Sequence, residues 1–317
     1  MQTKQFGKTG MQITPIGLGA WAIGGGQWES SWGPQDDQES IATIRRALDL
    51  GINWIDTAAV YGLGHSETIV GKAIKGRERP YIFTKSSLVW DEHGHVGHSL
   101  KADSLRREVE ASLKRLDIDV IDLYQIHWPD PASDLEEGWS TLAALKQEGK
   151  VRHIGVSNFS VEQMQRAEKI APVETLQPPY SLVHPDVEKE ILPYSQQHNI
   201  GVIVYSPMAS GLLTGSMTRK RIANMPDDDW RKKGTEFQEP RLSRNLALAD
   251  LLTVIGKAHN VTAGVVAIAW TLHNPAVTAA IVGARHPSQV EETIAAAEFR
   301  LSEREYEQIR QFVAQHP

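Results

Sequence analysis

The sequence predicts an α/β protein folded as one (β/α)8 barrel, and three observations favour this fold. Short apolar runs occur eight times along the chain, stretches with one apolar helical face lie between them, and no change in composition divides the 317 residues. A doubly wound open sheet is the rival fold, but it needs fewer strands and usually a second domain. We therefore predict a single barrel domain over residues 1–317.

The eight apolar runs are the predicted barrel strands. Each is four to eight residues long and rich in Val, Ile, Leu and aromatic residues, as expected of strands buried on both faces. The opening segment "KQFGKTGMQIT" alternates around a Gly and predicts a hairpin before the first of them. The predicted strands cover 15–19, 53–56, 81–85, 120–127, 153–157, 175–178, 201–206 and 278–284.

Helical periodicity fills the intervals between these runs. One set of apolar residues is Ile41, Ile44 and Leu48; a second is Leu105, Val109, Leu113 and Leu116; a third is Leu135, Trp139, Leu142 and Leu145. Capping residues agree, because Asp36 or Asp37 precedes the first helix and Ser160 is followed by Gln163 in a capping-box arrangement. An extra helix is predicted at the C-terminus, over 302–314, beginning at Ser302.

The longest interruption of the pattern is 207–245, which is polar, charged and poor in periodic apolar residues. Within a compact domain so long a loop is usually functional or mobile.

Composition excludes several classes of protein. The 33 Lys and Arg against 39 Asp and Glu give a formal charge of −6, without the basic footprint of a nucleic-acid or anionic-membrane binder. With no cysteine, neither a disulfide nor a thiolate metal site can form. The N-terminus lacks the apolar region of a secretory signal, and no apolar run approaches the ~18 residues of a membrane span. We predict a cytoplasmic protein that binds neither nucleic acid nor membrane.

Four polar residues gather where predicted strands end. Asp56 ends the second strand, Lys85 the third and His127 the fourth, while Tyr61 follows in the loop after the second. In a (β/α)8 barrel catalytic residues lie at these ends, and neighbouring strands are only ~4.8 Å apart. Each residue alone has an ordinary structural explanation, such as a loop cap or a solvated strand end. The prediction of a site therefore rests on the set.

This set suits the reduction of a carbonyl group. A phenol has a pKa near ~10, so it is a poor acid at neutral pH unless a nearby ammonium lowers that value. Lys85 would have this effect on Tyr61, Asp56 would hold Lys85 in place, and a neutral His127 would orient a substrate oxygen. The set contains no nucleophile, so a hydride from a cofactor would complete the reaction.

The sequence resembles the aldo-keto reductase superfamily over essentially its whole length. The resemblance is carried in order by "GINWIDTAAVYG", "IFTK", "DLYQIHWPD", "GKVRHIGVSNFS", "YSPMASGLLTG" and "AIVGARHPSQVEE". It is strongest to the bacterial branch that includes inositol-utilisation and general-stress reductases, and to the potassium-channel β subunits. The resemblance implies that Tyr61 is the proton donor, that Asp56 and Lys85 tune it, and that His127 orients the carbonyl.

The resemblance also implies a nicotinamide cofactor, held by the second half of the barrel. Ser157, Asn158 and Gln177 would bind the carboxamide and Tyr205 would stack on the nicotinamide ring. The remaining predicted cofactor contacts are Trp21, Gln27 and Asp56 near the nicotinamide, the segment Ser206, Pro207, Met208, Ala209, Ser210, Gly211 and Leu212 at the pyrophosphate, and Gly283, Arg285, Gln289, Glu292 and Thr293 at the adenosine, with Ser288 beginning the eighth helix.

Several positions depart from the family pattern at the phosphates. Ser216 stands where close relatives often have Lys, Thr293 where many have Asn, and Gly283 and Gln289 where many have a basic pair. Arg285, with basic residues of the long loop, could supply the charge instead. We expect NADPH in preference to NADH, without excluding NADH. The candidate basic residues are Arg219, Lys220, Arg231 and Lys232, although "RKR" at 219–221 is also what a solvated charged surface looks like.

Two motifs mimic other sites. "GLGAWA" (17–22) matches a dinucleotide fingerprint, but the glycine-rich segment after it cannot start a helix in the right place, so its glycines are attributed to a tight first loop. "HGHVGH" (93–98) has histidines spaced for zinc or nickel, but no acid or cysteine completes the set, so we predict an exposed loop and no metal.

Nine tryptophans suggest an aromatic pocket for small carbonyl compounds. Trp54 and Trp270 are predicted to be core, while the predicted substrate contacts are Trp21, Tyr61, Trp90, His127 and Trp128. Two alternatives to a reductase stay open: a nucleotide-binding regulatory subunit with little turnover, and an alcohol or polyol dehydrogenase that runs the same chemistry in the oxidative direction. A monomer is expected rather than an oligomer.

Overall fold

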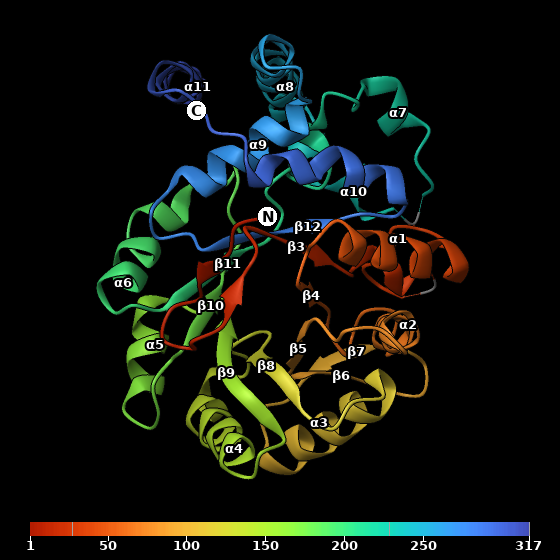
Figure 1. The fold of residues 1–317 in the computed structure, drawn as a ribbon, viewed down its shortest axis with the longest axis vertical. Coiled ribbons are helices and arrows are strands. Elements are labelled where there is room, and N and C mark those ends of the chain that lie inside the picture. Colours follow the sequence, from red (N-terminus) through yellow and green to blue (C-terminus); the bar gives the residue numbers. More distant parts are fainter. Residues whose placement is uncertain (27, 228, 317) are drawn as a thin grey trace.

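A computed structural model describes residues 1–26, 28–227 and 229–316, so the predicted contact at Gln27 lies outside the described residues. Eight parallel strands close into a barrel in the order β3-β4-β5-β8-β9-β10-β11-β12 (Figure 1). All eight predicted strands are confirmed, with ends shifted by at most two residues. They are β3 (Ile16–Gly19), β4 (Trp54–Asp56), β5 (Tyr81–Ser86), β8 (Ile121–Ile126), β9 (Val151–Ser157), β10 (Thr175–Gln177), β11 (Gly201–Val204) and β12 (Ala279–Gly283).

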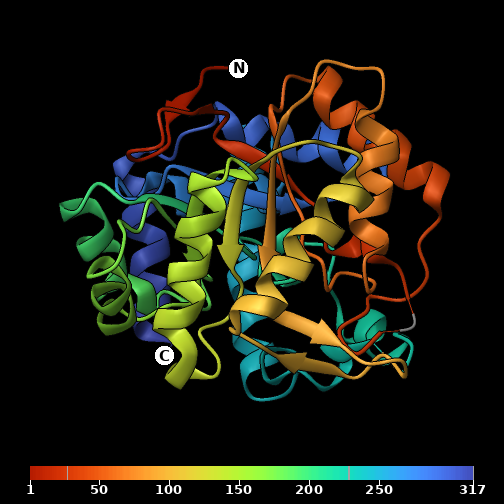
Figure 2. The same ribbon diagram turned by 90° about the horizontal axis from the view of Figure 1, so that it is seen from below.

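Two hairpins stand outside the barrel sheet. The predicted N-terminal hairpin, β1 (Lys4–Gln5) with β2 (Gln12–Ile13), lies at one end of the barrel. The second, β6 (Leu88–Trp90) with β7 (Val96–His98), lies toward the opposite end, where the strands point (Figure 2). The predicted exposed loop at 93–98 is thus partly a strand, and its turn is closed by Asp91, which accepts from the main-chain N–H groups of His93 and His95.

Helices surround the barrel (Figure 1). Those between or after barrel strands are α1 (Asp37–Asp49), α2 (His65–Ile74), α3 (Ala102–Leu116), α4 (Leu135–Gln147), α5 (Val161–Glu168), α6 (Ile191–Gln197), α9 (Ala263–His273) and α10 (Pro287–Thr293); α7 (Arg219–Ala223), α8 (Arg241–Ala258) and α11 (Glu303–Gln315) are additional. Short 3-10 helices are η1 (Ala22–Gly24), η2 (Ala132–Asp134), η3 (Asp186–Glu188), η4 (Leu212–Thr214), η5 (Trp230–Lys233), η6 (Thr235–Phe237) and η7 (Ile294–Ala297).

The predicted helix starts follow from their capping residues. Asp36 accepts a hydrogen bond from the N–H of Glu39, and Ser160 and Ser302 each form a capping box. The predicted start of the eighth helix at Ser288 is wrong, because His286 is the N-cap and Pro287, whose missing N–H costs nothing there, is the first helical residue.

The prediction of one long loop over 207–245 is only partly right. The segment contains α7 and the short helices η4, η5 and η6, and α8 already begins at Arg241. Leu242 and Asn245 are buried on one side of α8, while the polar residues between them face outward and hide the helical pattern from a periodicity search.

The glycines of "GLGAWA" act within the barrel, and the tight-loop explanation is wrong. Gly17 and Gly19 belong to β3. A Cβ on Gly17 would come within 2.2 Å of the Trp54 ring, and one on Gly19 within 2.7 Å of Ile281. Side chains of the neighbouring strands fill the space beside Gly17 and Gly19, so a larger residue would not fit at either position.

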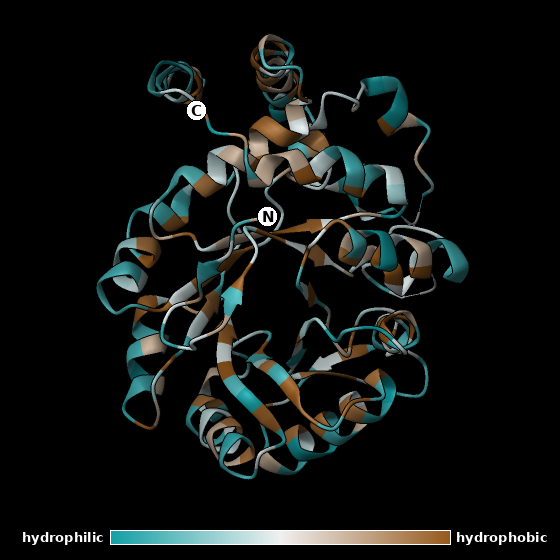
Figure 3. Ribbon diagram, viewed as in Figure 1, coloured by the Kyte–Doolittle hydropathy of each residue, from teal (hydrophilic) through white to brown (hydrophobic). Residues whose placement is uncertain are grey.

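The core has the two layers expected of a barrel. Trp54 and Trp270 are buried, as predicted. A cluster that includes Phe6, Trp54 and Phe83 fills the barrel beside the N-terminal hairpin, and the larger cluster packs the helices on the strands. Figure 3 shows hydrophobic residues along β12 and hydrophilic residues on outlying helices such as α7.

Among the described residues, no single helix is long and apolar enough to cross a membrane; α8 and α9, which meet at 94°, reach the required length and composition only as a bent pair.

Candidate active site

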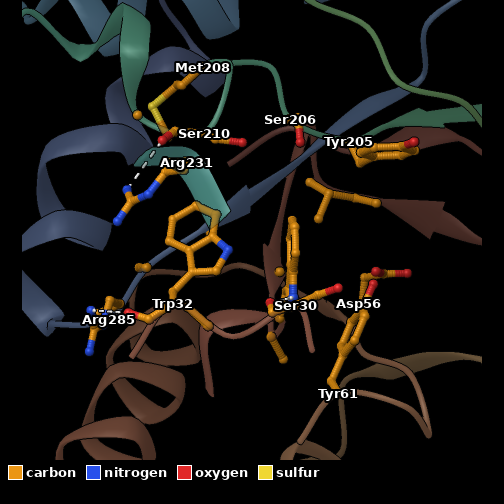
Figure 4. A pocket seen from close by; sticks show the side chains of 18 of the residues that line it. Ser30, Trp32, Asp56, Tyr61, Tyr205, Ser206, Met208, Ser210, Arg231 and Arg285 are labelled. Carbon is orange, nitrogen blue, oxygen red and sulfur yellow. Dashed lines mark hydrogen bonds between the residues drawn. The ribbon is translucent and has the colours of Figure 1, made fainter. Parts of the chain in front are cut away.

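A cleft of about 490 Å³ opens at the carboxyl ends of the barrel strands. Asp56 and Tyr61 lie at one end of it, and Arg231 and Arg285 lie near Trp32 toward the other (Figure 4). The cleft is thus elongated, with the predicted catalytic residues at one end and cations at the other. This shape suits a long ligand that carries its charge away from its reactive atom.

Lys85 connects the groups at the catalytic end. Its buried ammonium donates to Asp56 Oδ1 (2.6 Å), to the main-chain oxygen of Thr57 (2.9 Å) and to the Tyr61 hydroxyl (3.3 Å). The three residues come together because β4 and β5 are neighbouring parallel strands that both end at the cleft. The convergence predicted from strand ends is therefore present in the structure.

The ionisation of this group is set by burial and by Lys85. Burial lowers the pKa of Lys85, but the interactions with Asp56 and then with Tyr61 raise it by more than burial lowers it. The pKa of Lys85 therefore lies above its ordinary value. Burial raises the pKa of Tyr61, and this outweighs the opposite effect of Lys85. The expectation that Lys85 brings the phenol below its ordinary pKa is therefore wrong for the protein alone. Tyr61 stays protonated, which is the state that a proton donor needs.

His127 follows β8 and faces Tyr61, with the two ring centroids 5.8 Å apart in an edge-to-face arrangement. Its enclosed position in the cleft and then the charge of Lys85 lower the pKa of His127 well below the ordinary value. A neutral imidazole at this place can donate one N–H to a substrate oxygen. The main chain of His127 is fixed on two sides. Its main-chain N–H donates to the main-chain oxygen of Ser86 (3.1 Å), and its main-chain oxygen accepts from the side-chain amide of Asn158 (3.0 Å).

The predicted nicotinamide contacts form a connected wall. Tyr205 donates its hydroxyl hydrogen to Asn158 Oδ1 (2.8 Å), which fixes the ring against β9. Gln177 donates to Asp56 Oδ2 (2.8 Å), and the Ser157 hydroxyl donates to the main-chain oxygen of Gln177 (2.8 Å). The wall therefore shares one hydrogen-bond network with the catalytic end. Ser157, Asn158, Gln177 and Tyr205 all line the cleft.

Unusual backbone follows this wall. Ser206, Ala209 and Ser210 have positive φ values of 57°, 47° and 55°, and Gly211 follows at 90°. Non-glycine residues in this conformation are strained and concentrate at functional sites, where successive N–H groups can form a concave anion site. The segment thus fits the pyrophosphate of a dinucleotide. Together with the elongated cleft, it fits a nicotinamide nucleotide.

Three arginines line the cleft: Arg221, Arg231 and Arg285, of which Arg231 and Arg285 lie at the end away from Tyr61 (Figure 4). Arg231 lies over the Trp32 ring (4.5 Å) and is paired with Asp229 through two hydrogen bonds of 2.6 and 3.0 Å. Arg285 donates to Gln35 (2.6 Å), a neutral partner.

Arg221, which the sequence pattern did not single out, donates to Ser216 Oγ (3.0 Å). Its guanidinium therefore lies beside Ser216, one of the positions at which the sequence departs from the family pattern. Arg219 and Lys232, by contrast, are turned to Glu239 and Asp227, and neither they nor Lys220 line the cleft.

Some predicted contacts are not brought to the cleft. The prediction that Trp90 contacts the substrate is wrong. Trp90 does not line the cleft, and its ring lies over the Arg115 guanidinium (5.9 Å) of α3. Glu292 is exposed on α10 away from the cleft, and the Thr293 hydroxyl bonds within that helix. The side chains of Ala209 and Leu212, within the segment 206–212, are buried and do not line the cleft. Besides the four nicotinamide contacts described above, the residues of the predicted set that line the cleft are Trp21, Asp56, Tyr61, His127, Trp128, Ser206, Pro207, Met208, Ser210, Gly211, Gly283, Arg285 and Gln289.

Trp230 supports the aromatic residues of the cleft from behind without lining it, and sequence reasoning missed this. Its ring stacks on Trp21 at 6.1 Å with an interplanar angle of 12°. Trp21 in turn faces Trp32 and Tyr61. A tryptophan isolated among charged residues, as in "DDDWRKK", was the available signal. At 93–98 no metal cluster forms among the described residues.

Comparison with known proteins agrees with this geometry. The model of the Aldo/keto reductase family matches residues 15–314. The chain belongs to the aldo/keto reductase family. It is accordingly an oxidoreductase that interconverts small carbonyl compounds and alcohols with a nicotinamide cofactor.

Two relatives illustrate its place in the aldo/keto reductase family. The chain is 42% identical to "Aldo-keto reductase YhdN" of Bacillus subtilis over 295 residues, which cover 92% of this chain and 87% of that protein. It is 35% identical to the "NADH-specific methylglyoxal reductase" of Escherichia coli over 318 residues, 96% of this chain and 95% of the relative.

Two solved structures share the fold along nearly the whole chain. The glycerol dehydrogenase AKR11B4 from Gluconobacter oxydans has a TM-score of 0.90 and 39% identity, covering 99% of this chain and 96% of the other. An aldo/keto reductase from Klebsiella pneumoniae, in complex with NADP and acetate, has a TM-score of 0.75 and 29% identity, with coverage of 98% and 95%.

Proposed function

We propose that this aldo/keto reductase is an NADPH-dependent reductase of aldehydes and ketones, in which Tyr61 is the proton donor. The observation that carries the proposal is the position of the Tyr61 hydroxyl, 3.3 Å from the ammonium that Asp56 holds and beside a neutral His127. When bound, the nicotinamide supplies a hydride to the carbonyl carbon. The residues then have to orient the carbonyl oxygen and neutralise the charge that develops on it.

The division of labour follows from the contacts. His127 donates to the carbonyl oxygen and so turns the carbon toward the nicotinamide wall formed by Asn158 and Tyr205. Tyr61 gives its proton to the same oxygen as the oxygen gains negative charge. The ammonium of Lys85 stabilises the resulting phenolate, and Asp56 holds that ammonium in a buried position.

The cations at the distal end support NADPH as the preferred cofactor. A 2′-phosphate carries about two negative charges, and three arginines line the cleft: Arg231 and Arg285, which lie away from Tyr61 (Figure 4), and Arg221. The Klebsiella structure with NADP agrees with this preference, whereas the NADH-specific relative shows that the family can do without the phosphate. Arg221 is the strongest candidate, because its guanidinium contacts Ser216, where the resemblance implies that close relatives often have Lys.

The substrate end is aromatic and has few polar groups, which favours small aldehydes and ketones. Trp21, Trp28 and Trp128 line it, together with Leu88 and Val96. The likeness to a glycerol dehydrogenase favours oxidation of polyols as a second candidate, and the same residues serve both directions. A regulatory subunit with little turnover stays the third candidate.

Three further inferences concern the chain as a whole. We expect residues 1–317 to be one domain, because the closed barrel draws strands from residues 16 to 283. We expect a monomer, because Asp56, Tyr61 and Lys85 meet within one chain. A cytoplasmic location stays a prediction from the sequence.

The decisive experiment is a titration with NADPH and with NADH, followed by quenching of the cleft tryptophans, and then a panel of aldehydes, ketones and polyols monitored at the absorbance of reduced nicotinamide. Tight NADPH binding with aldehyde-dependent oxidation supports the reductase. Oxidation of polyols at a higher kcat/KM than aldehyde reduction would favour the dehydrogenase. Binding without turnover on any compound would favour the regulatory subunit.

A further inference from the structure

A carboxylate outside the catalytic group is held in an unusual setting. Glu108 of α3 is half-buried, and its two oxygens accept from the main-chain N–H of Ser87 (2.8 Å) and from the Ser104 hydroxyl (3.0 Å). Among the described residues no cation lies within ion-pair distance of it, and burial raises the pKa of Glu108 to about 7. Burying a carboxyl group costs free energy unless hydrogen bonds compensate for the lost solvation, so the hydrogen bonds of Glu108 stabilise it there.

The partner of Glu108 is a connecting point between three segments. Ser87 is fully buried and has a φ of 80°, which a non-glycine residue rarely adopts. Its hydroxyl donates to the main-chain oxygen of Trp128 (3.2 Å) and accepts from the Trp128 N–H (3.3 Å), and its main-chain oxygen accepts from Ser99 at the far end of the hairpin (3.0 Å). Glu108 therefore fixes a residue that ties the β6–β7 hairpin to the loop after His127.

These segments form one side of the substrate end. Leu88 of β6, Val96 of β7 and Trp128 line the cleft next to His127. Trp128 is 41% exposed, so its indole lies at the mouth and is not held by burial in the core. Its position depends instead on its main chain, which Ser87 grips on both polar groups. A shift of Ser87 would therefore move all three side chains relative to a bound substrate.

We propose that Glu108 is a positioning residue for the substrate: through Ser87 it sets the wall of Leu88, Val96 and Trp128, and thereby the affinity for carbonyl substrates with a bulky apolar group. The proposal rests on the proposed function, because it places the substrate beside His127. Glu108 touches neither the reacting atoms nor the cofactor end of the cleft. Its removal should change KM for large aldehydes and leave the chemical step intact.

The test compares Glu108→Ala, Glu108→Gln and Ser87→Ala, using benzaldehyde and propionaldehyde as substrates. Glu108→Ala leaves a buried N–H without its acceptor, so we expect KM for benzaldehyde to rise about tenfold, with kcat within about twofold. Glu108→Gln keeps an oxygen for the Ser87 N–H, and the Ser104 hydroxyl can turn to accept from its amide, so this variant should restore KM. Ser87→Ala removes the grip on Trp128 and should raise KM similarly.

The controls separate positioning from general damage. Glu110→Ala, on the same helix but exposed and paired with Lys150, should change neither KM. KM for propionaldehyde, which is too small to reach the wall, and the Kd for NADPH should stay the same in all variants. Because Glu108→Ala could fail to fold, Ser87→Ala provides an independent test of the same wall.

Four outcomes would overturn the proposal. An unchanged benzaldehyde KM in folded Glu108→Ala and Ser87→Ala proteins would show that the wall does not depend on this link. An equal loss of kcat for both aldehydes, or Glu108→Gln as impaired as Glu108→Ala, would point to a merely structural role or to the charge itself. If the wild-type protein turned over no carbonyl compound, the proposed function would fail first and the proposal with it, whereas wild-type turnover with unchanged KM values defeats the proposal alone.

Discussion

The two ends of the cleft are built by different means. At the catalytic end Asp56 and Lys85 project from neighbouring strands, are buried, and have partners inside the protein. At the distal end the cations come from the segment 207–233 and from the turn after β12, and Arg221 is exposed to solvent. The barrel thus fixes the proposed reactive groups rigidly, while longer connections supply the charges that we propose hold the far part of the cofactor.

This difference has an energetic consequence. A buried charge that loses its partner has no water to replace it, so a single change at the catalytic end should affect both activity and folding. An exposed cation is already solvated, so its loss should weaken only ligand binding. Each prediction below tests whether the two ends separate in this way.

The largest effect should come from Tyr61→Phe. Removal of the proton donor should lower kcat for aldehyde reduction by about 10²–10⁴-fold, the usual contribution of general acid catalysis. Steady-state kinetics measure the loss, and the Kd for NADPH should remain unchanged. Tyr194→Phe is the matched control, since it removes a hydroxyl that donates to Glu168 away from the cleft. An equal loss of kcat in both variants would deny Tyr61 its special role.

The next effect concerns folding. Lys85→Met leaves the buried carboxylate of Asp56 without its cation and should lower the free energy of unfolding by about 3–5 kcal/mol. The double variant Lys85→Met/Asp56→Asn should recover most of that stability and none of the activity. Urea unfolding measures both. Lys75→Met breaks the exposed pair with Asp117 and should leave the unfolding midpoint unchanged. If Lys85→Met were as mild as this control, the catalytic end would not be as tightly coupled as its burial indicates.

These two ends also differ in how far the sequence predicts them. Strand ends are fixed by the barrel, so the short apolar runs alone are enough to predict that Asp56 and His127 share one pocket and that Lys85 lies beside them. The distal end depends on how a polar insertion folds, and no periodicity encodes that path. Residues as close in sequence as Arg219 and Arg221 face different surroundings, Glu239 and the cleft. The prediction for Trp90 failed for a related reason, because the hairpin that carries it left no clear signal in the sequence.

A third prediction contrasts two carboxyl groups near the substrate end. Asp56 is paired with a cation, whereas Glu108 has no cation partner in the described part of the chain. The folded-state pKa of Glu108 is about 7, against an ordinary value of 4.5. The folded protein holds the proton of Glu108 more tightly than the unfolded chain does. Its stabilising contribution is therefore complete below pH 4.5 and is lost as the pH rises through about 7.

The wild-type protein should accordingly lose about 2 kcal/mol relative to Glu108→Gln between pH 5 and pH 8. Urea unfolding of both proteins at each pH measures this difference. Arg107 and Arg115 of the same helix act against the shift, and Tyr124 of β8 faces the same region. A difference between the two proteins that did not change with pH would mean that Glu108 is ionised throughout this range.

The smallest effect is expected at the distal end and tests it most directly. Arg221→Gln should raise the Kd for NADPH about tenfold, the value of one charge-assisted contact to a phosphate, and leave the Kd for NADH and protein stability unchanged. Arg219→Gln, two residues earlier and paired with Glu239, is the matched control and should change neither. Fluorescence titration at two salt concentrations measures the affinities, and the salt dependence of NADPH binding should weaken in Arg221→Gln. Equal losses for both nucleotides would instead assign Arg221 to the pyrophosphate, which both nucleotides share, and no loss would leave Arg231 and Arg285 as the phosphate-binding cations.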